Sequence, residues 1–213
     1  MPLFRKSNIN VFTTIFVWKI TETYNELFDS VQLNDNSLIR LEGMKSESHQ
    51  KGFLSVRRLL MEAGYSDFDL YYDEFGKPHL KDGKHISISH SHDFSAIAVS
   101  EVVLGIDLEI KKEKTLKIAP RFMDIAHLES LSYEDKIQKA TVVWGIKEAI
   151  FKIKNEKGIS FPEHIFEHDF LLQDKKCKAE LRFNNTVSHF DILFDFFEEY
   201  IFVCAFNSNS GKK

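Results

Sequence analysis

The sequence is poor in the residues that staple or interrupt a chain. It has 2 cysteines, 4 prolines and 9 glycines among 213 residues. Cys177 and Cys204 form neither a Cys-x-x-Cys pair nor a zinc-ligand spacing, so a disulfide framework and a cysteine metal site are excluded. We therefore expect two free, buried thiols in a reducing cytoplasm. No low-complexity segment and no Gly/Ser linker divides the chain.

An excess of positive charge and a long apolar run are also lacking. The formal net charge of −4 argues against a dedicated nucleic-acid-binding protein, which is usually basic. The apolar run at residues 10–20 is too short to cross a bilayer, contains Thr13 and Thr14, and has no small-residue cleavage site. We interpret it as the first strand, buried on both faces. The expectation is a cytoplasmic, monomeric protein without a membrane or nucleic-acid partner.

The order of helices and strands predicts an α+β protein. Helical apolar stripes predict helices over residues 46–63 and 132–154, the first closed by Gly64. Each is followed by strand-like segments: 68–80 with a turn at 76–78, 85–90, 95–101, 102–110, 176–183 and 191–206. A helix followed by an antiparallel meander, seen twice, suggests a pseudo-dimer of two similar halves. The predicted halves are residues 1–102 and 103–213, each a helix packed on an antiparallel sheet.

Two carboxylates interrupt the otherwise apolar strand at residues 102–110. The aliphatic side chains at the even-numbered positions point one way, and Asp107 and Glu109 point the other. The two carboxylates are about 7 Å apart along the strand, close enough to reach one small cation. Charge also protects edge strands from aggregation. Both interpretations, a cation site and a protected edge, remain open from these residues alone.

The helix predicted at 132–154 carries two different faces. Its core face comprises Val142, Ile146, Ala149, Ile150 and Ile153, and the opposite side comprises Trp144, Lys147, Glu148, Phe151 and Lys152. A solvated face would explain the charged residues, including an i, i+4 pair between Glu148 and Lys152. It does not explain two large aromatic residues, which need something to cover them. Glu148 is therefore a candidate third carboxylate beside Asp107 and Glu109.

Three carboxylates with lysines beside them suit phosphoryl transfer. Oxygen ligands favour Mg²⁺ or Mn²⁺, and nearby cations neutralise a pyrophosphate. No Gly-rich phosphate loop, dinucleotide fingerprint or nucleophile elbow is present, so scattered side chains must hold phosphates. The candidates are Lys77, Ser89, His90 and Arg57. Each also has an ordinary interpretation as a surface or turn residue, and His90 with His92 is a weak zinc signal without a third ligand.

Five short motifs occur in a specific order over residues 75–160. They are "FGKP", "ISISHS", "LGIDLEI", "WGIKEAIFK" and "KGIS". In this order they resemble the 4′-phosphopantetheinyl transferases of the larger, surfactin-synthetase-activating (Sfp-like) type. The resemblance implies coenzyme A bound between two α+β halves. It also implies transfer of phosphopantetheine to a serine of an apo carrier protein of fatty-acid, polyketide or peptide-synthetase type, with release of 3′,5′-ADP.

The resemblance also implies roles for individual residues. Asp107, Glu109 and Glu148 would hold Mg²⁺ or Mn²⁺, and Glu148 with Lys152 would be the catalytic pair, Lys152 contacting the phosphate on the leaving side. The implied coenzyme A contacts are Lys77, Ser89, His90 (near the 3′-phosphate), Lys147 and Arg57.

The chain departs from the family pattern at two places. Family members often begin the first helix with an arginine, whereas Gln50 or Lys51 stands here, with Arg57 as a distant substitute. Where the family usually has a glutamate, this chain has His127, followed by Glu129. At that position this chain therefore lacks the acidic side chain that the family pattern carries.

Two other functions compete with the transferase. Asp107, Glu109 and Lys111 also match the short D…E-x-K core of metal-dependent nucleases, although the acidic balance disfavours DNA. A catalytically silent carrier-protein-binding module is the second alternative. It would have lost a metal carboxylate or a lysine, and this chain retains them.

Overall fold

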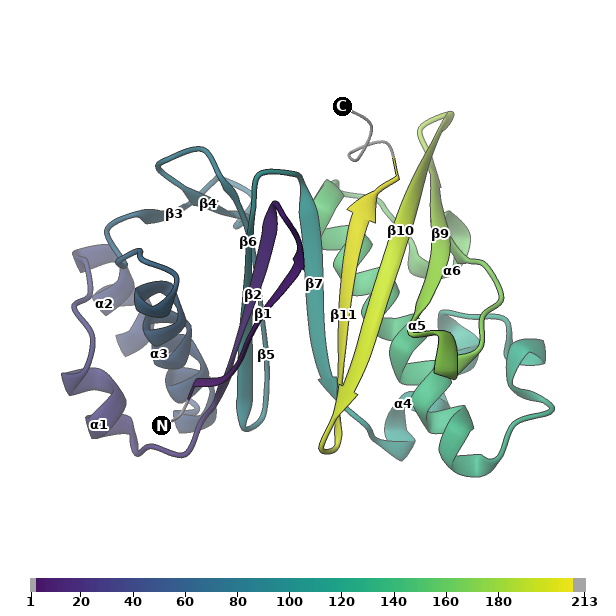
Figure 1. Ribbon diagram of the computed structural model, residues 1–213, viewed down its shortest axis with the longest axis horizontal. Helices are drawn as coiled ribbons and strands as arrows, with labels where there is room; N and C mark the ends of the chain where they lie inside the picture. Colours follow the sequence, from purple (N-terminus) through teal and green to yellow (C-terminus); the bar gives the residue numbers. More distant parts are fainter. Residues whose placement is uncertain (1–2, 209–213) are drawn as a thin grey trace. The chain divides into compact units, whose positions relative to one another are not determined.

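The computed structural model describes residues 3–208, and the chain divides into two compact units, residues 1–102 and 103–213 (Figure 1). The elements of the first unit are β1 (Leu3–Asn10), β2 (Thr13–Lys19), α1 (Tyr24–Asp29), α2 (Asp35–Glu42), α3 (Glu47–Glu62), β3 (Leu70–Tyr72), β4 (Pro78–Leu80), β5 (His85–Ser91) and β6 (Phe94–Ser100). Those of the second unit are β7 (Leu104–Ile110), α4 (Glu113–Ile118), η1 (Ala119–Arg121), η2 (Ile125–Leu128), α5 (Tyr133–Lys154), α6 (Phe161–His164), β8 (Ile165–Glu167), η3 (Leu172–Asp174), β9 (Lys176–Phe183), β10 (Thr186–Phe197) and β11 (Tyr200–Asn207). The described strand pairs are antiparallel, which confirms the α+β class.

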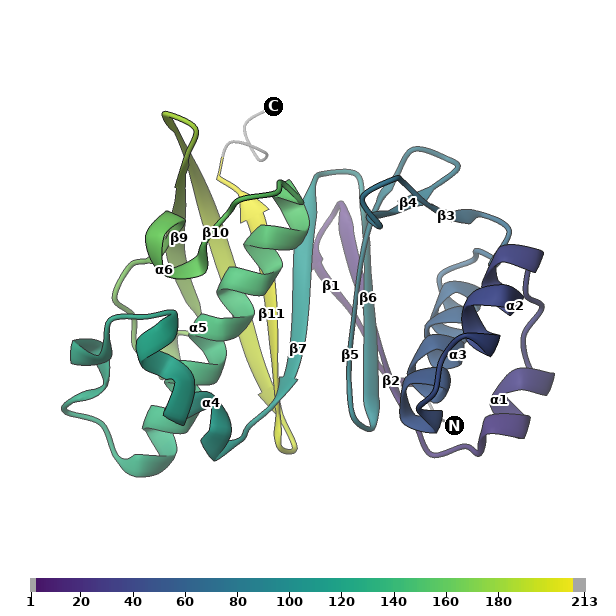
Figure 2. The ribbon, with the colours of Figure 1, turned by 180° about the vertical axis from the view of Figure 1, so that it is seen from behind.

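In the first unit, α3 packs on a four-stranded sheet of order β1-β2-β6-β5 (Figures 1 and 2). The apolar stripe of α3 is buried, with Leu54, Leu59 and Leu60 inaccessible to solvent. Gly64 has φ +85°, the left-handed conformation expected after the helix. The antiparallel β5–β6 pair is also confirmed. The short β3–β4 hairpin forms a separate two-stranded sheet and contacts β5 through β4.

The prediction that residues 10–20 form the first strand is wrong. β1 comes first, and the chain turns between Asn10 and Thr13, where the Asn10 side chain accepts a hydrogen bond from the Phe12 backbone N–H at 2.9 Å. The remaining part of the run is β2, whose residues 15–18 are buried as expected. β1 lacks a visible apolar period because most of its side chains are polar or charged and exposed. For that reason the pattern alone does not locate it.

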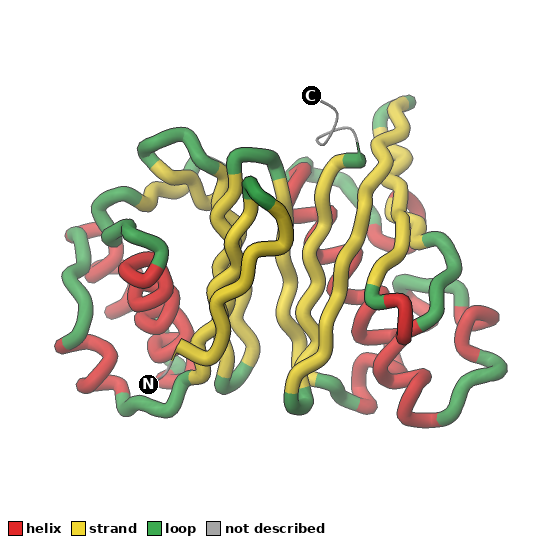
Figure 3. The backbone as a smooth tube through the Cα atoms, viewed as in Figure 1, coloured by secondary structure: helices red, strands yellow, loops and turns green. Residues whose placement is uncertain are grey.

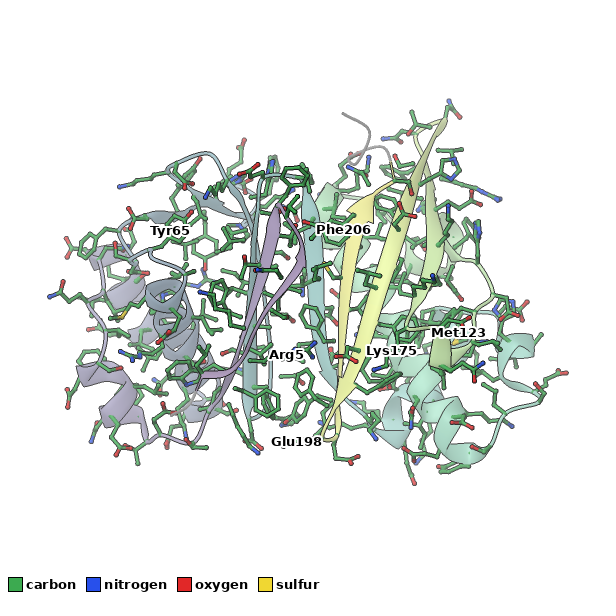
Figure 4. The ribbon with its side chains drawn as sticks, in the orientation of Figure 1. Arg5, Tyr65, Met123, Lys175, Glu198 and Phe206 are labelled. Carbon is green, nitrogen blue, oxygen red and sulfur yellow. The ribbon has the colours of Figure 1, made fainter. Side chains whose placement is uncertain are left out.

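In the second unit, α5 packs on a five-stranded sheet of order β7-β11-β10-β9-β8, and Figure 2 shows it in front of β7 and β11. The predicted helix 132–154 is confirmed. The Ser132 hydroxyl caps its start by accepting a hydrogen bond from the Asp135 N–H at 3.2 Å, and Asn155 ends it in the left-handed conformation. Figure 3 shows that the strand-like residues 191–206 belong to two strands, β10 and β11, joined by a tight turn at Glu198 (labelled in Figure 4).

The core of the second unit lies between α5 and the sheet. The predicted core face of α5 is confirmed, since Val142, Ile146, Ala149 and Ile150 are inaccessible to solvent and Ile153 is 5% exposed. Met123, labelled in Figure 4, belongs to the same buried cluster. Across residues 3–208, none of the helices combines the length and the apolar composition needed to span a membrane.

Candidate active site

β7 places Asp107 and Glu109 on one face of the second unit's sheet. Its hydrogen-bonded neighbour is β11, where Val203 lies opposite Asp107 and Ile201 opposite Glu109. The aliphatic face of β7 is buried as expected: Leu104, Ile106 and Leu108 are at most 3% exposed. However, α5 covers the other face, the one that carries the carboxylates. Asp107 is consequently 4% exposed, and a carboxylate buried to that degree requires charged or hydrogen-bonding neighbours.

Two glycines allow α5 to lie very close to β7. A Cβ on Gly105 would lie 2.9 Å from the carbonyl carbon of Ala149 and closer still to its oxygen. A Cβ on Gly145 of α5 would lie 2.7 Å from the Val203 side chain and 3.6 Å from Asp107 Oδ2. The helix backbone therefore approaches the strand where no side chain separates them. This close approach brings the charged residues of α5 to the carboxylates of β7.

Lys152 contacts the carboxylate strand directly. Its Nζ donates to Asp107 Oδ1 at 2.8 Å and to the Ile106 carbonyl oxygen at 3.0 Å. The Lys152 side chain is 30% exposed, so its ammonium group pairs with the buried Asp107 while part of the side chain reaches solvent. Because the interaction ties α5 to β7, it also fixes Lys152 beside the carboxylates.

The pKa values show that the three carboxylates lie within electrostatic reach of one another. Burial first, and then the Asp107 charge, raise the pKa of Glu109 to about 7, with a smaller contribution from Glu148. Burial and Asp107 likewise raise the pKa of Glu148, whereas Lys152 opposes both shifts. Like charges held close in a poorly solvated place disfavour full ionisation. Such a cluster is stabilised by a cation.

The donor chemistry fits a hard divalent ion, but the side chains do not yet converge on one. Carboxylate oxygens are the ligands that Mg²⁺ and Mn²⁺ prefer. Within residues 3–208, no group of three or more His, Cys, Asp or Glu side chains is arranged to hold a metal ion. One oxygen of Asp107 is instead engaged by Lys152. Ion binding by these carboxylates would therefore require their side chains to turn toward a common point.

Trp144 connects the carboxylates to an aromatic cluster. Its indole Nε1–H donates to Glu109 Oε1 at 3.3 Å. The Trp144 ring meets the edges of Phe122 and Phe161 at centroid distances of 5.2 and 5.5 Å, and Phe151 lies 6.1 Å from Phe161. The two aromatic residues on the second face of α5 are therefore covered, as the sequence required, by aromatic residues of the same unit. The hydrogen bond to Glu109 was not predicted from the sequence.

Lys147 does not join this site. It is 2% exposed, forms an ion pair with Glu167 at 3.0 Å, and donates to the Ile165 carbonyl oxygen at 2.5 Å. Burial lowers its pKa, and Glu167 opposes that shift. The helical period placed Lys147 with Glu148 on the open face, but β8 meets it there with a carboxylate and a carbonyl group. Its role is to hold α5 against β8.

In the first unit, Lys77 lies on the turn between β3 and β4. Its backbone N–H donates to Asp73 Oδ1 at 2.9 Å, and its carbonyl oxygen accepts from the Asp73 N–H at 3.0 Å. Burial lowers the pKa of Lys77, and the Asp73 charge opposes this effect. The turn expected at Gly76 is confirmed by its φ of +79°.

Ser89 and His90 are successive residues of β5 and point to opposite faces. Ser89 is buried, whereas His90 is exposed. The His90 ring packs over Gly52 of α3, where a Cβ would lie 3.3 Å from the ring. His49 lies nearby, with a ring-centroid distance of 6.1 Å to His90. The first turns of α3 are thus beside His90.

Arg57 forms part of the first unit's core. It is 3% exposed, pairs with Asp67 at 2.9 Å, and stacks on the Phe53 ring with the guanidinium carbon 3.4 Å from the centroid. It also donates to the Ser37 hydroxyl at 3.2 Å. These contacts engage the guanidinium group in linking α3 to the segments before and after it. The role of Arg57 as a coenzyme A contact stays a prediction of the resemblance.

Comparison with known proteins finds similar proteins that are all named as 4′-phosphopantetheinyl transferases. 4′-Phosphopantetheinyl transferase Sfp of Bacillus subtilis (strain 168) is 33% identical over 121 residues, 54% of this chain and 53% of the relative. 4′-Phosphopantetheinyl transferase psf-1 of Bacillus pumilus is 36% identical over 91 residues, 40% of this chain and 39% of the relative. The chain is similar to the Sfp-type 4′-phosphopantetheinyl transferases.

A longer match extends this similarity. 4′-Phosphopantetheinyl transferase ffp of Bacillus subtilis is 28% identical over 152 residues, 67% of each chain. The chain spans about half the length of the first of these phosphopantetheinyl transferases. No family model matches it. The resemblance predicted from the five motifs is confirmed.

The two departures from the pattern of these transferases lie on different elements, one on α3 and the other on and just after η2. Gln50, on α3, donates to the Met44 carbonyl oxygen at 3.0 Å, and Lys51 beside it is half-buried. His127 lies on η2, and the pKa of nearby Asp169 is lowered first by its hydrogen bond with Lys139 and last by His127. Glu129 is exposed. Neither His127 nor Glu129 is among the causes of the raised pKa values of Glu109 and Glu148.

Proposed function

We propose that this chain transfers the 4′-phosphopantetheine group of coenzyme A to a serine hydroxyl of an apo carrier protein and releases 3′,5′-ADP. The observation that carries the proposal is a group of three carboxylates and one lysine shared by β7 and α5. Lys152 hydrogen-bonds to Asp107, and the charges of Asp107 and Lys152 shift the pKa values of Glu109 and Glu148. The named activity of the similar proteins supports it.

Asp107, Glu109 and Glu148 are the proposed ligands of Mg²⁺ or Mn²⁺. When bound, the ion neutralises charge on the pyrophosphate of coenzyme A. The raised pKa values of Glu109 and Glu148 support this assignment, because the clustered carboxylates repel one another without a cation. Trp144 fixes one oxygen of Glu109 from outside the ligand set.

The proposed transfer forms one bond from the serine oxygen to the phosphorus next to pantetheine. It breaks the bond from that phosphorus to the oxygen that leaves with 3′,5′-ADP. The serine proton must be removed, and Glu148 is the proposed acceptor. The leaving phosphate gains negative charge, and Lys152 is the proposed neutralising group. Its pairing with Asp107 shows that it is held at the carboxylates, on the same side of α5 as Glu148.

Coenzyme A binding is proposed to use Lys77, Ser89 and His90 of the first unit. Lys77 supplies positive charge and His90 a ring N–H donor, and a phosphate is the group they would recognise. Lys147 and Arg57 are left out because each is buried in an ion pair within its own unit. The cytoplasmic location and the monomeric state expected from the sequence stay predictions.

Mass spectrometry of carrier proteins tests the proposal. Apo carriers of fatty-acid, polyketide and peptide-synthetase type are incubated with the chain, coenzyme A and Mg²⁺. The expected result is a mass gain of one phosphopantetheine group on at least one carrier, abolished by EDTA and restored by Mg²⁺ or Mn²⁺. Glu148→Gln should remove the gain, whereas Glu156→Gln, an exposed control just beyond α5, should retain it. A folded chain that modifies no carrier contradicts the proposal.

A further inference from the structure

The turn between β3 and β4 is organised by a single carboxylate. Asp73 Oδ1 accepts hydrogen bonds from the N–H groups of Phe75 at 3.0 Å and Lys77 at 2.9 Å. The Asp73 carbonyl oxygen accepts from the Gly76 N–H at 3.0 Å, and the Asp73 N–H donates to the Lys77 carbonyl oxygen at 3.0 Å. Asp73 is therefore hydrogen-bonded to Phe75, Gly76 and Lys77, the three residues that complete the turn. An aspartate at this position is a common turn organiser.

The second oxygen of the same carboxylate is held by a histidine on β4. Asp73 Oδ2 lies 3.0 Å from His79 Nε2, and the His79 ring stacks on Tyr71 of β3 with a centroid distance of 5.3 Å. The side-chain hydrogen bond to His79 is the largest cause of the lowered pKa of Asp73. The histidine thus fixes the carboxylate, and the tyrosine fixes the histidine.

The hairpin needs these bonds because its strands are very short. β3 and β4 have three residues each and pair only with one another within the described sheets. An isolated two-stranded ribbon of this length is marginal in water. The shape of the turn must then come from side-chain contacts, and Asp73 and His79 supply them. The turn carries Lys77, half-buried, and Phe75, 71% exposed.

A carboxylate beside Lys77 also presents an electrostatic difficulty. The Asp73 charge acts on Lys77, and an anionic ligand of Lys77 would be repelled by that charge. His79 lies on the far oxygen of the carboxylate, where a protonated imidazole offsets the negative charge and a neutral one still donates a hydrogen bond. Asp73 Oδ1 thus accepts the hydrogen bonds of the turn, while Oδ2 faces His79, which can offset the carboxylate charge.

We propose that Asp73 and His79 are positioning residues that set the affinity for coenzyme A by fixing the turn that presents Lys77. The proposal rests on the proposed function, because it takes Lys77 as a ligand of coenzyme A. In this proposal, neither Asp73 nor His79 touches the reacting atoms. Their contribution is to hold the backbone of Lys77 in place before the ligand arrives, which lowers the ordering cost of binding.

A neighbouring turn provides a matched control. Asp82, between β4 and β5, accepts from the Lys84 N–H at 3.0 Å with one oxygen and from the Tyr65 hydroxyl at 2.7 Å with the other (Tyr65 is labelled in Figure 4). It has the same construction as Asp73: one oxygen on a turn and one on a ring donor. Lys77 is not part of that turn. Asp82→Ala should therefore reproduce the loss of a turn contact without the loss of ligand affinity.

The variants are compared by steady-state transfer kinetics and by calorimetric titration with coenzyme A. Asp73→Ala should raise KM and the dissociation constant for coenzyme A by ~10-fold with kcat within about 2-fold, the pattern of lost ground-state binding. Asp73→Asn keeps an oxygen for the turn and should stay within about 3-fold of the wild type. His79→Ala should raise both constants by ~3-fold, and Asp82→Ala should leave them unchanged.

Hydrogen exchange of the Phe75 and Lys77 amides provides a readout that does not need the ligand. Both should exchange faster in Asp73→Ala and remain protected in Asp82→Ala. If Asp73→Ala does not fold, His79→Ala carries the test. Equal constants in Asp73→Ala, Asp82→Ala and the wild type would overturn the positioning role while leaving the transferase intact. A wild-type chain that neither binds coenzyme A nor modifies a carrier would overturn both.

Discussion

Replacing Gly105 by alanine should force α5 away from β7 and disable the candidate site. The new Cβ would lie 2.9 Å from the Ala149 carbonyl carbon, closer to its oxygen, and 3.1 Å from Ile153 Cγ1. Carbon atoms in favourable contact are about 3.5–4.0 Å apart. The obstructing atoms belong to the helix backbone, which cannot change rotamer. The helix as a whole must therefore move.

The expected loss in the free energy of unfolding follows from the buried position of the contact between Gly105 and Ala149. Overpacking a core typically costs about 1–3 kcal/mol. Here the upper end applies, since Gly105 is buried and Ala149 and Ile153 belong to the core face of α5. A loss of ~3 kcal/mol lowers the Tm of a domain of roughly 100 residues by at least ~10 °C. The displacement also lengthens the 2.8 Å contact between Lys152 and Asp107, so carrier modification should fall with it.

Thermal unfolding followed by circular dichroism measures the effect, with Gly145→Ala as the control. The Cβ at Gly145 would meet the Val203 side chain, whose methyl groups can shift, and alanine favours the helix by about 1 kcal/mol. The control should lose clearly less stability than Gly105→Ala. The reasoning is refuted if Gly105→Ala unfolds within ~3 °C of the wild type, because the strand and helix would then have room for the methyl group.

Three further predictions concern the candidate site and its surroundings. Lys152→Ala should lower kcat by ~10²-fold or more, and Lys152→Arg should retain more activity because it keeps the charge. If the arginine variant is as inactive as the alanine variant, the result would instead assign proton donation to the lysine. Trp144→Phe keeps the aromatic packing but removes the N–H that is bonded to Glu109, so calorimetry should show ~10-fold weaker Mn²⁺ binding with an unchanged Tm. An unchanged Mn²⁺ affinity would contradict a role of Trp144 in orienting Glu109. Cys204 is buried as expected, whereas Cys177 is only half-buried. Desolvation nevertheless raises the pKa of Cys177 to about 12 and also raises that of Cys204, so an aromatic disulfide reagent at pH 8 should label neither thiol in the native protein and both in urea. Rapid native labelling of either thiol would contradict this reasoning.

The sequence was most informative where one element carries its own signal. The helix at 132–154 was predicted from a capping serine and a continuous apolar stripe, and both features are local. Asp107 and Glu109 were placed on one face of a strand by alternation alone. α1 also has a local signal, a capping box between Thr23 and Glu26, although it was not predicted.

The sequence was least informative where the meaning of a residue depends on a distant partner. Lys147 and Glu148 are neighbours in one motif, but a helix turns by about 100° per residue, so they meet different strands. Glu167, on β8, makes Lys147 a buried structural residue. Arg57 is similarly assigned by Asp67. Periodicity describes which way a side chain points and does not describe what lies there.

The order of strands in the second unit has a consequence for biosynthesis. Within the described sheet, β7 pairs with β11 alone, and β11 follows the other described strands of the unit in the sequence. As the chain leaves the ribosome, the strand carrying Asp107 and Glu109 emerges long before its pairing partner. The carboxylates and Lys152 can therefore assume their final arrangement only after Val203 has emerged. Early termination before β11 should leave a product without any partial activity, whose unpaired strand is recognised by chaperones and proteases.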